Sequence, residues 1–136
     1  LFRSRALAAD LQALGATPPA PPLTRAVQQY VERLRAISAA DPGRLVAHAY
    51  VRYLGDLNGG QALRRVVARS LGLADEAGTR LYDFGDSATQ QRLEQGLRAG
   101  LESSAAQQPD LQALADEALD AFERHEQLFE ELAVSA

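Results

Sequence analysis

The sequence contains no cysteine, no methionine, no tryptophan and no lysine, and all 14 of its basic residues are arginine. The absence of cysteine excludes disulfides, thiolate metal ligands and cysteine nucleophiles. The absence of lysine excludes Schiff-base catalysis and a phosphate-binding P-loop. Only two histidines are present, His48 and His125, which argues against a metal site built from several histidines.

The 136 residues carry 14 basic and 18 acidic side chains, a net charge of −4, which argues against a nucleic-acid partner held by bulk positive charge. No apolar run approaches the roughly 18 residues of a transmembrane helix. No basic-then-apolar signal peptide is present, so we expect a cytoplasmic protein. Because position 1 is Leu1 and no methionine occurs anywhere, we expect a piece of a longer protein.

Apolar residues recur at spacings of three and four along most of the chain, and no alternating β-branched run occurs. The pattern predicts an all-α fold of five or six helices in a single domain over residues 1–136. The predicted helices cover residues 3–14, 24–40, 44–71, 86–104 and 111–132, the third of them interrupted by glycines. The proline-rich stretch 17–22 predicts an extended connector.

Helix ends are predicted from capping residues. Gly15 fits the position after a helix end, and Thr24 fits an N-cap. Asp41 fits a second N-cap, followed by Pro42 at the first helical position. Asp86 or Ser87 is predicted to cap the helix that follows the glycine-containing loop.

The last helix shows the clearest apolar stripe, which is predicted to face the core. Its members are Leu111, Ala115, Ala118, Phe122, His125, Phe129 and Leu132.

The segment 45–61 reads LVAHAYVRYLGDLNGGQ and places three glycines inside a predicted helix. Each costs about 1 kcal/mol relative to alanine, so a compensating gain or a kink is expected. Gly55 and Gly59 share one face, and without Cβ atoms that face admits another helix or a planar ligand at short range. Arg52 and Asp56 are four residues apart, so a surface ion pair is one interpretation of both.

This segment resembles the distal-helix signature of the heme oxygenases, which reads close to AHAY-x-RYLGDL-(S/N)-GGQ. The likeness continues over residues 62–73, the loop of Tyr82 and Phe84, and the closing residues 121–132, and it reaches back over residues 7–34. The resemblance implies the all-α heme oxygenase fold, with heme between a proximal and a distal helix.

By this resemblance, the distal helix is kinked between Gly55 and Gly60, and the backbone of Gly55, Gly59 and Gly60 touches the heme face. Asp56 would hold the water network that delivers protons on the distal side, supported by Arg52 and Tyr53. Close helix–helix packing is the alternative explanation of the glycines.

The resemblance also implies that Tyr50 and Arg98 reach the heme propionates. Arg92 would take over from the family's lysine, whose position is occupied here by Glu94. Phe122 would line the pocket wall.

Three arginines, Arg64, Arg65 and Arg69, fall where the family has basic residues for docking a ferredoxin or a flavin reductase; a solvated helix face is the alternative. The family's axial histidine is expected upstream of Leu1. His48 matches a histidine that does not bind iron in the family, and His125 lies on the closing helix, so we expect structural roles for both.

The predicted function is that of a heme oxygenase, which uses an external electron donor to convert heme to biliverdin, carbon monoxide and ferrous iron. Heme would be both substrate and cofactor, and we expect this segment alone to be inactive. The alternatives are a heme-binding or heme-sensing relative without turnover, and a helical interaction module without heme.

Overall fold

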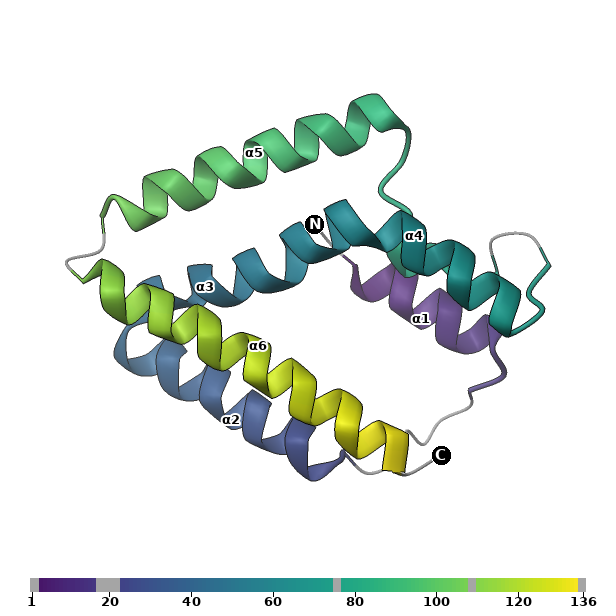
Figure 1. Cartoon of the computed structure of the whole chain (residues 1–136), viewed down its shortest axis with the longest axis horizontal. Helices are drawn as coiled ribbons and strands as arrows, with labels where there is room; N and C mark the ends of the chain where they lie inside the picture. The colour runs from purple at the N-terminus through teal and green to yellow at the C-terminus, as the bar shows by residue number, and fades with distance from the viewer. Residues whose placement is uncertain (1–2, 17–22, 75–76, 108–109, 135–136) are drawn as a thin grey trace. The chain divides into compact units, whose positions relative to one another are not determined.

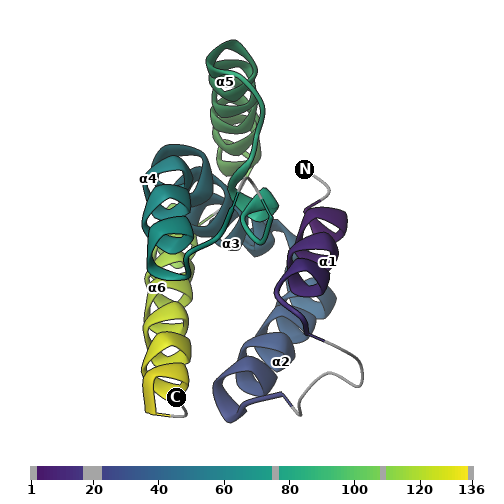
Figure 2. The ribbon, with the colours of Figure 1, turned by 90° about the vertical axis from the view of Figure 1, so that its right-hand side faces the viewer.

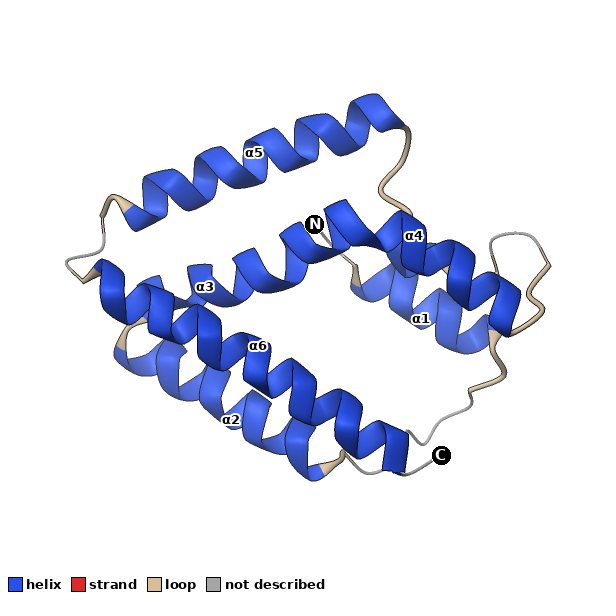
Figure 3. Cartoon of the chain, viewed as in Figure 1, coloured by secondary structure: helices blue, strands red, loops and turns tan. Residues whose placement is uncertain are grey.

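The structure, a computed structural model, describes residues 3–16, 23–74, 77–107 and 110–134. Within these ranges the chain consists of helices joined by turns and loops, with no strand (Figure 3). The predicted all-α class is confirmed. The predicted connector 17–22 lies outside the described residues. None of the described helices combines the length and apolarity needed to cross a membrane.

Six α-helices and three short helical turns account for the elements of the described chain (Figure 1). The α-helices are α1 (Ser4–Ala13), α2 (Arg25–Ala40), α3 (Leu45–Ala49), α4 (Gly55–Ser70), α5 (Ser87–Ala105) and α6 (Leu111–Val134). The turns are η1 (Pro42–Arg44) and η3 (Arg80–Tyr82), both 3₁₀-helical, and η2 (Tyr50–Leu54), which is π-helical.

Most of the predicted helix ends are confirmed. Thr24 Oγ1 accepts the Val27 backbone N–H at 3.4 Å at the start of α2. Gly15 has φ +75°, and the Ala16 backbone N–H donates to the Leu11 carbonyl at 2.9 Å, which closes α1 with a Schellman motif.

Two aspartates at the predicted breaks behave differently from each other. Asp86 caps α5 by accepting the Thr89 backbone N–H at 2.8 Å, and the hydroxyl and backbone N–H of Thr89 lower the pKa of Asp86. Asp41 makes no side-chain cap. That prediction is wrong because the Asp41 carboxylate instead accepts a hydrogen bond from Arg44 Nε at 3.1 Å.

The chain forms two compact units, each assembled from separate stretches of sequence. The first unit comprises Leu1–Pro21 and Gly55–Glu94, and the second comprises Pro22–Leu54 and Gln95–Ala136. Two of the boundaries fall inside predicted helices, between η2 and α4 and within α5, and the third falls in the predicted connector 17–22.

In the first unit, η3 packs against both α1 and α4. The Asp10 carboxylate, 4% exposed, accepts the backbone N–H groups of Arg80 at 2.8 Å and Leu81 at 2.7 Å. Arg3 Nη2 donates to the carbonyls of the same two residues, and its guanidinium lies 4.3 Å from the centre of the Phe84 ring. Asp10 and Arg3 together hold residues 80–84 against α1.

In the second unit, α2 runs antiparallel to α6. Glu131, near the end of α6, accepts the backbone N–H groups of Arg25 at 3.1 Å and Ala26 at 2.7 Å, so it caps α2 from a neighbouring helix. Figure 2 shows the start of α2 and the end of α6 at the same end of this unit. Hydrogen bonds from the Ala26 backbone and the Thr24 hydroxyl lower the pKa of Glu131.

The apolar stripe predicted on α6 does not form the core. Glu117 and Ala121 are the buried residues of this helix. Phe122 is 54% exposed and Phe129 is 65% exposed. A polar cluster around Glu117 meets α2 and α3 on the buried side of α6, and of the stripe His125 meets Tyr30 on α2.

Candidate functional site

The segment with the glycine signature forms α3, η2 and α4, which follow one another without a loop (Figure 1). The departure from α-helical geometry is the π-helical turn Tyr50–Leu54, and the chain is regular α-helix from Gly55 onward. The π-helical turn thus lies one turn before the kink predicted between Gly55 and Gly60, which stays a prediction. A π-helical turn holds an extra residue, and such turns are frequent at functional sites.

The three glycines of α4 have different surroundings. A Cβ atom built on Gly55 or Gly59 meets no atom of the described residues within 4 Å. A Cβ atom built on Gly60 would lie 3.3 Å from Cδ1 of Tyr82. Close packing against Tyr82 therefore explains Gly60, whereas no described residue packs against the Cβ position of Gly55 or Gly59.

Tyr82 is held against Gly60 by several contacts within the first unit. Gln61 Nε2 donates to the Tyr82 carbonyl at 2.9 Å, from the residue next to Gly60 on α4. The hydrogen bonds of Asp10 and Arg3 hold the same turn from the α1 side. Tyr82 is thus a buttress between α1 and α4, in keeping with the family-like loop to which it belongs.

Asp56 lies on the inward side of α4, in line with Gly60 one turn later. It is 7% exposed, as is its neighbour Leu57. The surface position in the ion-pair interpretation of Asp56 is therefore wrong, because the residue is buried; its pairing with Arg52 stays a prediction. A buried carboxylate is costly unless polar groups bond to it, so Asp56 occupies a position that is unusual for an acidic residue.

The π-helical turn carries three of the predicted site residues, each in a different setting. Tyr50 is 45% exposed and lines an apolar cleft of about 320 Å³. The cleft is closed by residues of α3, by Leu101 near the end of α5 and by Leu114 on α6. Arg98 is exposed and lies one turn before Leu101 on α5.

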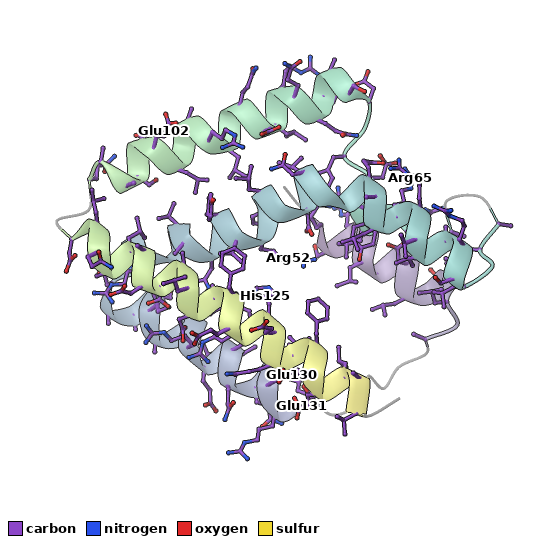
Figure 4. The ribbon with its side chains drawn as sticks, viewed as in Figure 1. Arg52, Arg65, Glu102, His125, Glu130 and Glu131 are labelled. Carbon is purple, nitrogen blue, oxygen red and sulfur yellow. The ribbon has the colours of Figure 1, made fainter. Side chains whose placement is uncertain are left out.

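Arg52 and Tyr53 line a second cavity, of about 330 Å³, together with Tyr30, His48 and His125. Figure 4 labels Arg52 and His125. Both histidines have internal partners. Nδ1 of His125 is 2.7 Å from the Ala121 carbonyl, and both ring nitrogens of His48 lie within hydrogen-bond distance of protein atoms. These internal bonds support the structural roles expected for the two histidines, which stay predictions.

The remaining predicted residues lie on exposed helix faces. Arg92 donates to the Thr89 hydroxyl at 3.0 Å near the start of α5. Phe122 is exposed on α6. Arg65 and Arg69 are exposed on α4, with Arg64 half-buried beside them. Figure 4 labels Arg65 on this helix.

The predicted residues are divided between the two units. Gly55, Asp56, Gly59, Gly60 and Arg92 belong to the first; Tyr50, Arg52, Tyr53, Arg98 and Phe122 belong to the second. Among the described residues, no group of three or more histidine and acidic side chains is placed to hold a metal ion.

The sequence analysis did not single out Tyr30, Glu117, Asp10 and Arg3. Tyr30 and Glu117 hold His48, and Asp10 and Arg3 hold the turn that contains Tyr82. The sequence does contain a signal for Glu117: it is an acidic residue at helical spacing from the apolar Leu114 and Ala121, which places it on the same face of α6 as these two residues. Asp10 offered none, because its partners are backbone groups far away in sequence.

The fold and the glycine-bearing helix define an all-α protein with a side-chain-free face beside a buried carboxylate. The profile of the heme oxygenase family matches residues 1–131. Over 110 residues the chain is 38% identical to heme oxygenase 1 of Nostoc, covering 81% of this chain and 46% of that protein. Over 112 residues it is 40% identical to heme oxygenase 1 of Pongo abelii, covering 82% and 39%.

Solved structures agree with these matches. Heme oxygenase from Leptospira interrogans is similar with a TM-score of 0.87 and 38% identity, covering 96% of this chain and 65% of that one. Heme oxygenase-1 from Synechocystis, in complex with heme, gives a TM-score of 0.80 and 35% identity, covering 96% and 59%. The chain belongs to the heme oxygenase family. It spans about half the length of the curated cyanobacterial and algal relatives it matches.

Proposed function

We propose that this chain supplies the distal wall of a heme site in an enzyme that cleaves heme to biliverdin, carbon monoxide and ferrous iron. The observation that carries the proposal is the side-chain-free face of Gly55 and Gly59, which no described atom fills within 4 Å. Backbone with no Cβ offers a flat ligand close contact, and glycine is otherwise costly in a helix.

The residues present fit a porphyrin on this face. A Cβ at either open glycine would occupy the space into which the ligand fits, and α4 keeps regular helical geometry there without the stabilisation that alanine would add. The heme supplies the redox chemistry, and the protein supplies binding, orientation and electrostatics.

Asp56 is the residue we assign to proton delivery. Its carboxylate oxygens accept hydrogen bonds and orient water, and its burial shields it from bulk solvent. Arg52 and Tyr53 support it from the π-helical turn; they line a cavity of about 330 Å³, which has room for ordered water.

Tyr50 and Arg98 are the residues we assign to the propionates. Tyr50 stands at the mouth of the apolar cleft, and Arg98 precedes the α5 residues that line it. Arginine binds carboxylates in a bidentate manner, which suits a propionate. Arg92 and Phe122 complete the proposed contacts, as a second cation and as part of the pocket wall.

The electron donor is proposed to be a ferredoxin or a flavin reductase. Its docking face is formed by Arg64, Arg65 and Arg69 on α4, a cationic row that suits an acidic protein surface. The cytoplasmic location and the single-domain organisation stay predictions.

The test is a hemin titration followed by turnover, carried out on the protein at its natural length. We expect a shift of the Soret band on binding, followed by its replacement with biliverdin absorption once a reductant is added. A shifted band that persists under reducing conditions identifies a heme-binding protein without turnover. An unshifted band identifies a helical module without heme and refutes the proposal.

The role of Asp56 is tested separately with Asp56→Asn, which keeps the shape and removes the charge. We expect hemin binding to remain and biliverdin formation to fall by at least about a hundredfold, the low end for a positioned proton-transfer group. The matched control is Asn58→Ser, an exposed neighbour on the same helix. Normal biliverdin formation by Asp56→Asn would remove the carboxylate from the mechanism.

A further inference from the structure

A buried polar cluster joins three helices of the second unit. Glu117 on α6 is 2% exposed and His48 on α3 is 6% exposed. Glu117 Oε1 lies 3.1 Å from His48 Nε2 and accepts Arg33 Nε at 3.0 Å, while Oε2 accepts Arg33 Nη2 at 2.5 Å. Arg44 Nη1 lies 4.0 Å from Oε2, so two arginines and a histidine surround one carboxylate.

The other side of the His48 ring is held equally firmly. Its Nδ1 lies 3.0 Å from the Tyr30 hydroxyl, and the Tyr30 ring meets the His125 ring edge-on at 5.2 Å between centroids. A neutral imidazole protonated on Nε2 satisfies both bonds, since it donates to Glu117 and accepts from Tyr30. His48 is therefore fixed from α6 and from α2 at the same time.

His48 lies two residues before the π-helical turn, so the contacts of the cluster fix the end of α3 from which this turn begins. A π-helical turn is less favourable than α-helix and persists where surrounding contacts stabilise it. The turn Tyr50–Leu54 continues α3 without a loop and packs against α6, the two helices that the His48–Glu117 contact joins. It carries Tyr50, Arg52 and Tyr53, side chains to which the proposed function assigns roles.

We propose that Glu117, acting through His48, is a positioning residue that maintains the π-helical turn and hence the orientation of Arg52 and Tyr53. The Glu117 carboxylate contacts Arg33, Arg44 and His48, and through His48 it fixes the end of α3 from which the turn begins. The consequence for heme rests on the proposed function, whereas the consequence for the turn does not.

Amide hydrogen exchange tests the structural half of the proposal. Glu117→Gln keeps the size of the side chain and removes the charge that Arg33 and His48 share. We expect amide exchange in residues 50–54 to accelerate at least tenfold more than in residues 61–70 of α4. Glu126→Gln, an exposed acid on the same helix, is the matched control and should change neither segment. Equal acceleration in both segments would show a general loss of stability and overturn the proposal.

Tyr30→Phe provides a milder second variant if Glu117→Gln does not fold. It removes only the hydroxyl that bonds His48 Nδ1 and leaves the ring in place. The same selective acceleration in residues 50–54, by at least threefold, is expected. Unchanged exchange there would overturn the proposal as well.

Hemin binding tests the functional half of the proposal. Its failure can be distinguished from a failure of the proposed function itself. Where the unaltered protein binds hemin, Glu117→Gln should alter the Soret position or the distal ligand spectrum, while Glu126→Gln should not. An unaltered spectrum with a loosened turn would overturn the positioning role toward heme. If the unaltered protein binds no hemin, the proposed function fails, and the exchange experiment still decides the role of Glu117 in the turn.

Discussion

Replacing Gly59 by alanine is expected to change the free energy of unfolding and the affinity for hemin in opposite directions. Gly59 lies inside α4, and a Cβ there meets no described atom within 4 Å. Alanine is favoured over glycine in a helix interior by about 0.8–1.0 kcal/mol, with no steric cost at an open position. We therefore expect Gly59→Ala to raise the free energy of unfolding by about that amount, or the Tm by roughly 3–6 °C.

The same methyl group should weaken hemin binding. It would stand between the helix backbone and the porphyrin plane, a small-to-large change that typically costs about 1–3 kcal/mol. The Kd for hemin should rise by about five- to 150-fold. A change that stabilises the empty protein and weakens ligand binding is the signature of a side-chain-free position kept for the ligand.

Urea unfolding without heme and a Soret titration measure the two effects independently. Gly100→Ala on α5 is the matched control, because a Cβ there also meets no described atom. Gly100 lies two residues from Arg98, roughly 200° around the helix, so it points away from the proposed propionate contact. The control should gain stability and keep its hemin affinity. A Gly59→Ala variant that is more stable and binds hemin as tightly as the unaltered protein would refute the reasoning.

Three further predictions concern the proposed propionate contact and the ties that hold each unit together. Arg98→Glu should weaken hemin binding or change the biliverdin isomer formed, measured by Soret titration and product chromatography, and should do so more than Arg92→Glu; equal effects would remove its special role. Asp10→Asn should lower the free energy of unfolding by about 1–3 kcal/mol in urea, because one of two buried backbone N–H groups loses its acceptor; an unchanged midpoint would contradict this. Glu131 has a lowered pKa, so its stabilising contribution is present above the carboxyl pKa of the unfolded chain, about 4.3, and is lost as pH falls through the folded value. Glu131→Gln should therefore be less stable than the unaltered protein at neutral pH and converge with it in acid, while Glu130→Gln should track the unaltered protein throughout; a difference that is constant with pH would contradict the capping role.

The helices could be predicted from the sequence because local signals determine them. Thr24 and Gly15 mark helix ends through bonds within a few residues, and these were predicted in the right places. Asp41 shows where local reasoning fails, since a competing partner, Arg44, takes the carboxylate that would otherwise cap. An aspartate cap can be predicted from the local sequence only where no nearby cation competes for its carboxylate.

The inward face of α6 could not be predicted, for a different reason. Periodicity tells which residues share a face, but not which face meets a neighbouring helix. Here the inward row contains Glu117, and its stabilisation comes from Arg33 and His48, which are 84 and 69 residues away in the sequence. A charged residue can be turned inward only when such partners converge, and convergence is a property of the tertiary structure.

The three glycines of the signature show the same division within one motif. Gly60 lacks a side chain because Tyr82, which bonds to Gln61, occupies the space that a Cβ would need; Asp10 and Arg3 hold the neighbouring residues of the same turn. Gly59 lacks one although a Cβ there would meet no atom of the described residues within 4 Å, so packing against those residues does not offset the cost of glycine. A resemblance in sequence treats the two positions alike. Their different surroundings assign Gly60 to packing against Tyr82 and leave Gly59, with Gly55, as the positions at which the proposed heme contact would offset the cost of glycine.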